Sequence, residues 1–84
     1  MKAKDAPHIL LVMKDKPFSD YLRKSLSRYY QISILEDPDL IIHTIIRQIP
    51  DTIIIDDNVN GISGDSLCFQ VKADKTMGEI PVVL

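Results

Sequence analysis

The chain has 84 residues, of which 45% are apolar and 26% are charged, and its formal net charge is −2 at pH 7. This length accommodates one small domain, residues 1–84, and the composition is typical of a globular protein. The balanced charge offers no basic surface for nucleic acid, and no apolar run approaches the roughly 20 residues that a membrane-spanning helix requires. The single cysteine, Cys68, excludes an internal disulfide and suits a reducing compartment, so we expect a cytoplasmic protein.

The first half of the chain predicts two strands separated by a helix. Residues 1–7 are expected to form a flexible N-terminal segment, and the apolar run His8–Met13 predicts a strand whose two faces are both covered. Pro17 is favourable in the first turn of a helix. Apolar side chains then recur every three or four residues and predict one buried helix face, made of Phe18, Leu22, Leu26 and Tyr29. The run Tyr30–Leu35 predicts the second strand.

The middle of the chain continues this alternation of helix and strand. Pro38 is expected to begin a second helix, and Thr52–Asp56 is expected to form the third strand. The buried stripe of the second helix is predicted to consist of four isoleucines, Ile42, Ile45, Ile46 and Ile49.

A third helix and a fourth strand complete the predicted elements. Ser63 is a favourable N-cap for the helix, and Asp65 suits its first turn because carboxylates are stabilised at helix N-termini. Gly78 is expected to end the helix, and Ile80–Leu84 is expected to form the strand. The buried face of the helix is predicted to be Leu67, Cys68 and Val71. Strands that alternate with helices predict an α/β fold with a parallel sheet.

The stretch from Pro50 to Gly64 is the most informative part of the sequence. An apolar strand ends in a carboxylate, Asp56, and a polar loop with two glycines, Gly61 and Gly64, follows it. In an open α/β sheet, ligands bind at the carboxyl ends of the strands. Together with the first strand and the ending Ile80-Pro81-Val82-Val83-Leu84, this stretch resembles the receiver domains of response regulators in two-component signalling.

The resemblance extends from His8 to Leu84 and implies a flavodoxin-like, doubly wound parallel sheet with strand order 2-1-3-4. We expect this fold to be incomplete, βαβαβαβ, because the family has a fifth strand and further helices. The resemblance also implies that Asp56 is equivalent to the aspartate that accepts a phosphoryl group from a histidine kinase, and that Gly61 and Gly64 are the loop glycines.

The resemblance also shows which residues of the family's metal site have been replaced. Met13 and Lys14 stand where the family has two adjacent acidic residues, and neither a thioether nor an ammonium group suits the hard cation Mg²⁺. Asp15 substitutes for them only if the strand bulges, and Asn58 matches a position that supplies a backbone carbonyl. We therefore expect no cofactor, with Mg²⁺ bound only if the site is still functional.

Two interpretations of Lys14 are open. Strands one and three are neighbours in the implied fold, so the ammonium group of Lys14 can form an ion pair with Asp56. Alternatively, Lys14 points into water, because an exposed ion pair contributes only about 0–1 kcal/mol.

Three functional hypotheses follow from these residues. The first is a two-component receiver module that is not an enzyme, does not bind Mg²⁺ or accept phosphate efficiently, and acts through contact with a histidine kinase or an output domain. The second is a fragment of a working phosphoacceptor in which a histidine kinase phosphorylates Asp56, although Met13 and Lys14 argue against it. The third and most remote is a fragment of a haloacid-dehalogenase-like phosphatase, whose Asp-x-Asp pattern is only partly matched by Asp56-Asp57-Asn58.

The fourth predicted strand suggests self-association. Its residues are apolar and strongly β-prone, and an uncharged strand at the edge of a sheet is a template for pairing with another chain. We therefore expect a homodimer through the exposed fourth strand, with no contact to membrane or nucleic acid.

Overall fold

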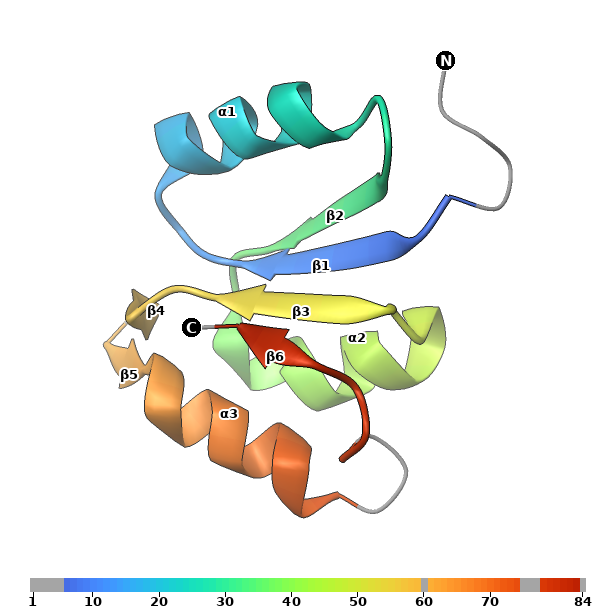
Figure 1. Cartoon of the computed structure of the whole chain (residues 1–84). Helices are drawn as coiled ribbons and strands as arrows, with labels where there is room; N and C mark the ends of the chain where they lie inside the picture. The colour runs from blue at the N-terminus through green and yellow to red at the C-terminus, as the bar shows by residue number, and fades with distance from the viewer. Residues whose placement is uncertain (1–5, 60, 75–77, 84) are drawn as a thin grey trace.

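The computed structural model describes residues 6–59, 61–74 and 78–83 (Figure 1). Its main sheet is parallel and has the strand order β2-β1-β3-β6, which confirms the predicted order 2-1-3-4. These strands are β1 (His8–Val12), β2 (Gln31–Leu35), β3 (Thr52–Ile55) and β6 (Val82–Val83). A second, antiparallel sheet that was not predicted pairs β4 (Asn58–Val59) with β5 (Ile62–Ser63).

Helices lie on both faces of the main sheet. Figure 1 shows α1 (Lys16–Leu26) on one face of the sheet, and α2 (Ile41–Gln48) and α3 (Gly64–Ala73) on the other face. A single 3₁₀ turn, η1 (Pro38–Leu40), leads into α2. Among the described residues, no helix is long and apolar enough to cross a membrane.

The helix starts follow the chemistry that the sequence predicts. Asp15 is the N-cap of α1, and its Oδ1 accepts a hydrogen bond of 3.1 Å from the Phe18 N–H, while Pro17 lies in the first turn. Ser63 is the N-cap of α3, as predicted, and its Oγ accepts a hydrogen bond of 3.1 Å from the Ser66 N–H.

Element ends differ from the prediction by one or more residues. Met13 and Asp56 each follow the last residue of their strand, and Tyr30 precedes β2. Helix α3 ends at Ala73, so Gly78 does not end it. The predicted fourth strand is shorter than expected, and Leu84 lies outside the described residues, as do residues 1–5 of the expected flexible segment.

The side chain of Lys72 ties the end of α3 to the segment that enters β6. Its Nζ donates hydrogen bonds to the backbone carbonyls of Gly78, at 3.1 Å, and Ile80, at 2.7 Å. In the described part of the chain, β6 pairs with β3 through the short stretch Val82–Val83, next to a 3.0 Å hydrogen bond from the Ile53 N–H to the Pro81 carbonyl, so the two bonds from Lys72 also contribute to the position of the strand.

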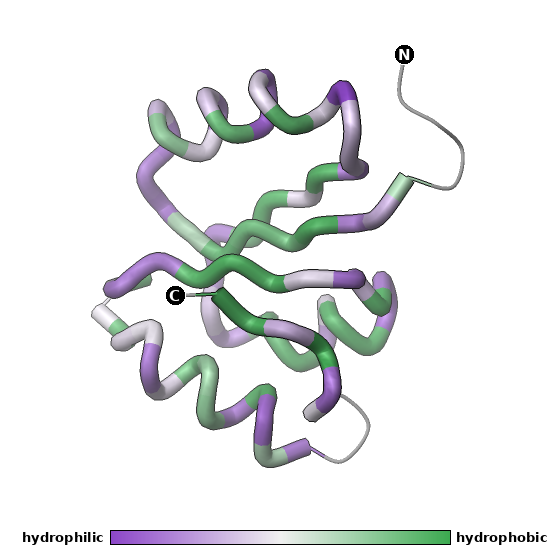
Figure 2. Tube along the Cα trace, in the orientation of Figure 1, coloured by the Kyte–Doolittle hydropathy of each residue, from purple (hydrophilic) through white to green (hydrophobic). Residues whose placement is uncertain are grey.

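The hydrophobic core has two parts, one on each face of the main sheet, and the strands form the most hydrophobic part of the trace in Figure 2. The larger part packs α2 and α3 against the sheet, and its buried members are Leu10, Val12, Ile41, Ile45, Ile53, Ile55, Val59, Leu67 and Val71. The smaller part lies beneath α1. It consists of Ile9, Leu11 and Met13, with Leu22, Tyr30, Ile32, Ile34 and Ile54 packed against them.

The predicted stripes of α1 and α2 are partly wrong. On α2 the buried residues are Ile41 and Ile45, whereas Ile46 and Ile49 are 58% and 72% exposed. The isoleucines form two overlapping stripes that share Ile45, and the helix buries the one that begins at Ile41.

Ile49 is the C-cap of α2 and has a left-handed backbone with φ of 46°. On α1, Phe18 is 48% exposed, and Tyr29, which lies beyond the helix end, is 64% exposed. On α3, Cys68 is only half-buried.

Candidate functional site

Asp56 lies at the carboxyl end of β3, immediately after the last strand residue. Its backbone N–H donates a hydrogen bond of 3.0 Å to the carbonyl of Val12, which ties the end of β3 to the end of β1. Its Oδ1 accepts a hydrogen bond of 2.8 Å from the Asp57 N–H, and the residue is half-buried. The sheet thus places this carboxylate at the edge where ligands of open α/β sheets bind.

Met13 occupies the end of the neighbouring strand. Val12 and Ile55 are register partners, so Met13 and Asp56 follow paired residues of β1 and β3. The Met13 side chain is 1% exposed and belongs to the part of the core beneath α1. A buried thioether therefore lies beside Asp56, at a position where a hard cation requires oxygen ligands.

Lys14 and Asp15 complete the segment that the resemblance makes equivalent to the family's metal site. Lys14 is exposed, and its predicted ion pair with Asp56 stays a prediction. One carboxylate oxygen of Asp15 caps α1. Among the described residues, no three His, Cys, Asp or Glu side chains form a group that could hold a metal ion. Met13 and Lys14 themselves offer no oxygen side-chain ligand to a hard cation.

The loop after Asp56 is held at both ends. Gly61 has φ of 86°, a left-handed backbone that glycine adopts without strain. It precedes β5, which pairs antiparallel with β4 and leads the chain into α3. The Gly64 N–H donates a hydrogen bond of 2.7 Å to the Asp57 carbonyl, which closes the loop at the start of α3. Within this loop, the side chain of Val59 is fully buried in the larger part of the core. Asn58 contributes its backbone to β4.

An open groove of about 350 Å³ lies between α1 and the end of β3. Its walls are mostly apolar, and two carboxylates stand among them. The lining residues are Met13, Phe18, Leu22, Ile54, Ile55, Asp56 and Asp57. Phe18 and Leu22 are not among the predicted site residues, because their spacing of four residues also predicts the buried face of a helix. Their place just after Met13 was the available signal.

Three known proteins show what the chain resembles, although no family model matches it. The response regulator PleD of Caulobacter vibrioides is 34% identical over 61 residues, which are 73% of this chain and 13% of PleD. The signal receiver domain of a signal transduction histidine kinase from Syntrophus aciditrophicus superposes with a TM-score of 0.84 and 26% identity, over 92% of this chain and 59% of that one. This chain is a receiver domain of the response-regulator type.

A third neighbour of the receiver domain carries a metal. The Mn²⁺-bound form of the response regulator Rcp1 superposes with a TM-score of 0.78 and 23% identity, over 90% of this chain and 62% of Rcp1. This receiver domain shares that fold but has Met13 and Lys14 directly after β1. It spans 13% of the length of PleD and less than two thirds of either solved neighbour.

Proposed function

We propose that this receiver domain acts in two-component signalling through protein–protein contact, and that it does not bind Mg²⁺ or accept a phosphoryl group efficiently at Asp56. The observation that carries the proposal is the burial of Met13 beside Asp56. Its sulfur is a poor ligand for a hard cation, and its side chain belongs to the apolar core beneath α1.

The chemistry of phosphoryl transfer supports the same conclusion. Charge on the transferred group has to be neutralised, commonly by a metal ion, while the attacking oxygen is held in line. Asp56 and a second carboxylate, Asp57, both line the groove, and the other residues that line it are apolar. A phosphoryl group at this place would add negative charge to a site that already carries two carboxylates.

Two measurements test the proposal directly. Calorimetric titration with Mg²⁺ should give no binding heat, and intact-mass spectrometry after treatment with acetyl phosphate and Mg²⁺ should show no added phosphoryl group. Asp56→Asn serves as the control for modification elsewhere. A stoichiometric adduct that disappears in Asp56→Asn would show instead a working phosphoacceptor, the second hypothesis. Turnover of p-nitrophenyl phosphate would favour a phosphatase.

We further propose that its partners are a histidine kinase or an output domain and a second copy of the chain. The edge of β6 supports the second copy: β6 pairs with β3 on one side, and no strand of the described residues pairs with its other side. Val83 on this strand is 51% exposed, and an apolar, unpaired edge favours strand pairing between chains. Two such edges related by a two-fold axis give a closed dimer.

Sedimentation velocity over a micromolar concentration series tests the dimer. We expect dimerisation in the unmodified chain and weaker dimerisation in Val83→Lys, because a lysine at the edge opposes strand pairing. A monomer at every concentration, or an unchanged dimer in Val83→Lys, would contradict an interface at β6.

A further inference from the structure

The groove beneath α1 extends from the position of Asp56 over an apolar wall that phosphoryl transfer does not require. Its apolar part is formed by Phe18 and Leu22, one helical turn apart on α1, and by Met13 and Ile54 of the sheet. Phe18 is 48% exposed, so its ring is accessible at the rim. A volume of about 350 Å³ is within the range of protein pockets that bind ligands, which are mostly apolar with a few placed polar groups.

The groove also carries a defined charge. Asp56 and Asp57 line it at the carboxyl end of β3, and no basic side chain is among its lining residues. The ligand that complements this arrangement has an apolar part for Phe18, Leu22 and Ile54 and a cationic group beside it for the two carboxylates.

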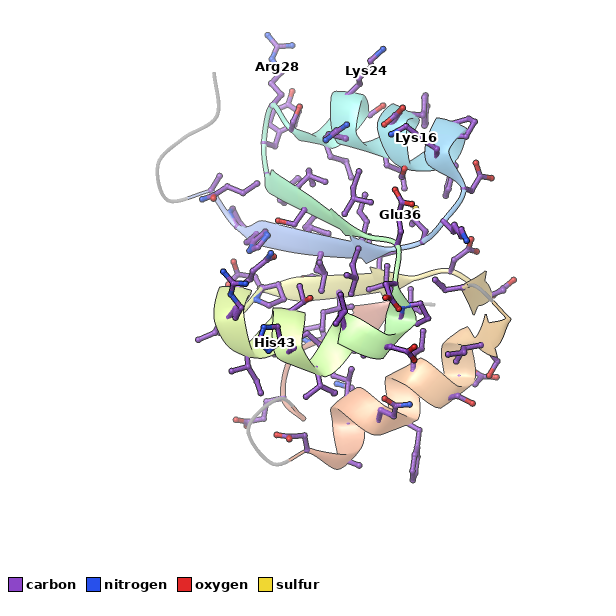
Figure 3. All side chains as sticks on the ribbon, turned by 180° about the vertical axis from the view of Figure 1, so that it is seen from behind. Lys16, Lys24, Arg28, Glu36 and His43 are labelled. Atoms are coloured by element: carbon purple, nitrogen blue, oxygen red, sulfur yellow. The ribbon has the colours of Figure 1, made fainter. Side chains whose placement is uncertain are left out.

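The opposite face of the same receiver domain presents that combination. On α2, Ile46 and Ile49 are 58% and 72% exposed, and the basic residue Arg47 lies between them in the sequence. Figure 3 shows α2 in front, on the side away from α1, with the exposed His43 labelled on it. Two large apolar side chains exposed together with an arginine are typical of interface residues, in which arginine is enriched.

We propose that the groove beneath α1 binds the exposed face of α2 of a second copy, with Ile46 and Ile49 against the apolar wall and Arg47 beside Asp56 and Asp57. The contact joins two different surfaces, so a pair of copies keeps a free groove on one copy and a free α2 on the other. Repetition of this contact gives either a ring or an open chain of copies.

This inference extends the proposed action through protein contact and rests on that proposal, since a copy bound in the groove covers Asp56. The groove contact involves other residues than the β6 interface and leads to a different number of copies in the assembly. A β6 contact alone stops at the dimer, whereas the groove contact continues beyond it.

The test uses charge reversal on each half of the contact in the full chain. Arg47→Glu places a carboxylate opposite Asp56 and Asp57, and Asp57→Lys places a lysine opposite Arg47, so each variant alone should associate about tenfold more weakly. An equimolar mixture of the two variants should associate as the unmodified chain does, because every contact between unlike copies again joins opposite charges. Both positions are exposed, so folding should be unaffected.

Lys24→Glu is the matched control, because Lys24 is an exposed base on α1 that points away from the sheet in Figure 3. It should leave the association constant from sedimentation velocity unchanged. The proposal is overturned if the unmodified chain never exceeds a dimer, if Arg47→Glu has no more effect than Lys24→Glu, or if the mixture fails to recover association. The acetyl phosphate experiment tests the proposed function separately, since a phosphoryl adduct at Asp56 refutes that function whether or not the copies associate.

Discussion

Replacing Met13 with aspartate is the sharpest test of the proposal that an apolar side chain stands in place of a metal ligand. The Met13 side chain is 1% exposed and packs in the core beneath α1 with Leu22 and Ile54. Truncating a buried methionine to alanine costs about 2–5 kcal/mol. A carboxylate left there without a partner adds about 1–3 kcal/mol. We therefore expect Met13→Asp to lower the free energy of unfolding by at least about 3 kcal/mol.

This loss is large relative to the whole domain. At the usual stability per residue, a chain of this length has a free energy of unfolding of about 4–12 kcal/mol. Met13→Asp should therefore lose about a quarter or more of this free energy of unfolding in the absence of metal. Urea denaturation followed by far-ultraviolet circular dichroism measures the change. Met13→Leu keeps the volume and the apolar surface, so it should cost less than about 1.5 kcal/mol.

Lys14→Asp is the control that separates burial from charge. It introduces the same residue one position later, at an exposed site, and should change the stability by no more than about 0.5 kcal/mol. If Met13→Asp proved as mild as Lys14→Asp, the argument that a closed apolar site replaces the metal site would fail. In the double variant with both aspartates, saturating Mg²⁺ at about 100 times its Kd should restore about 2.7 kcal/mol.

Two further predictions concern the backbone of Ile49 and the anchor of β6. Ile49→Gly should raise the free energy of unfolding by about 1 kcal/mol in urea denaturation, since a β-branched residue with φ of 46° is strained and glycine is not. Gln48→Gly, inside the helix, should lower it by a similar amount, and equal effects of both would refute the strain. Lys72→Met removes two hydrogen bonds to Gly78 and Ile80, so amide exchange of Val82–Val83 should quicken about fivefold, as expected for ~1 kcal/mol. No change in exchange would show that β6 is held by its pairing alone.

The order of strands and the starts of helices could be predicted because both depend on local chemistry. Apolar runs of strand length identified the four strands of the main sheet, and Pro17 and Ser63 marked helix starts through their own backbone and side-chain preferences. The family resemblance then supplied the strand order, which periodicity does not contain.

The burial of α2 could not be predicted, because its isoleucines satisfy two stripes equally well. Only the position of the helix over β1 and β3 selects Ile41 over Ile46. The small hairpin had a signal in the dipeptide Asn60-Gly61, which favours tight turns between strands. The signal for the apolar groove was the position of Phe18 and Leu22 just after Met13, but both residues also satisfy the pattern of a buried helix face.

The burial of Val59 has a mechanical consequence for signalling. The loop between Asp56 and Gly64 is closed by a backbone hydrogen bond and carries Val59 into the core beside Leu67 and Val71 of α3. A loop fixed in this way cannot absorb a displacement of Asp57 within itself, because Val59 would have to leave a close-packed site. If a partner bound at the groove shifts the loop, the loop and α3 are therefore expected to move together as one rigid body. The first detectable response to such a partner is expected on the helix, far from the contact.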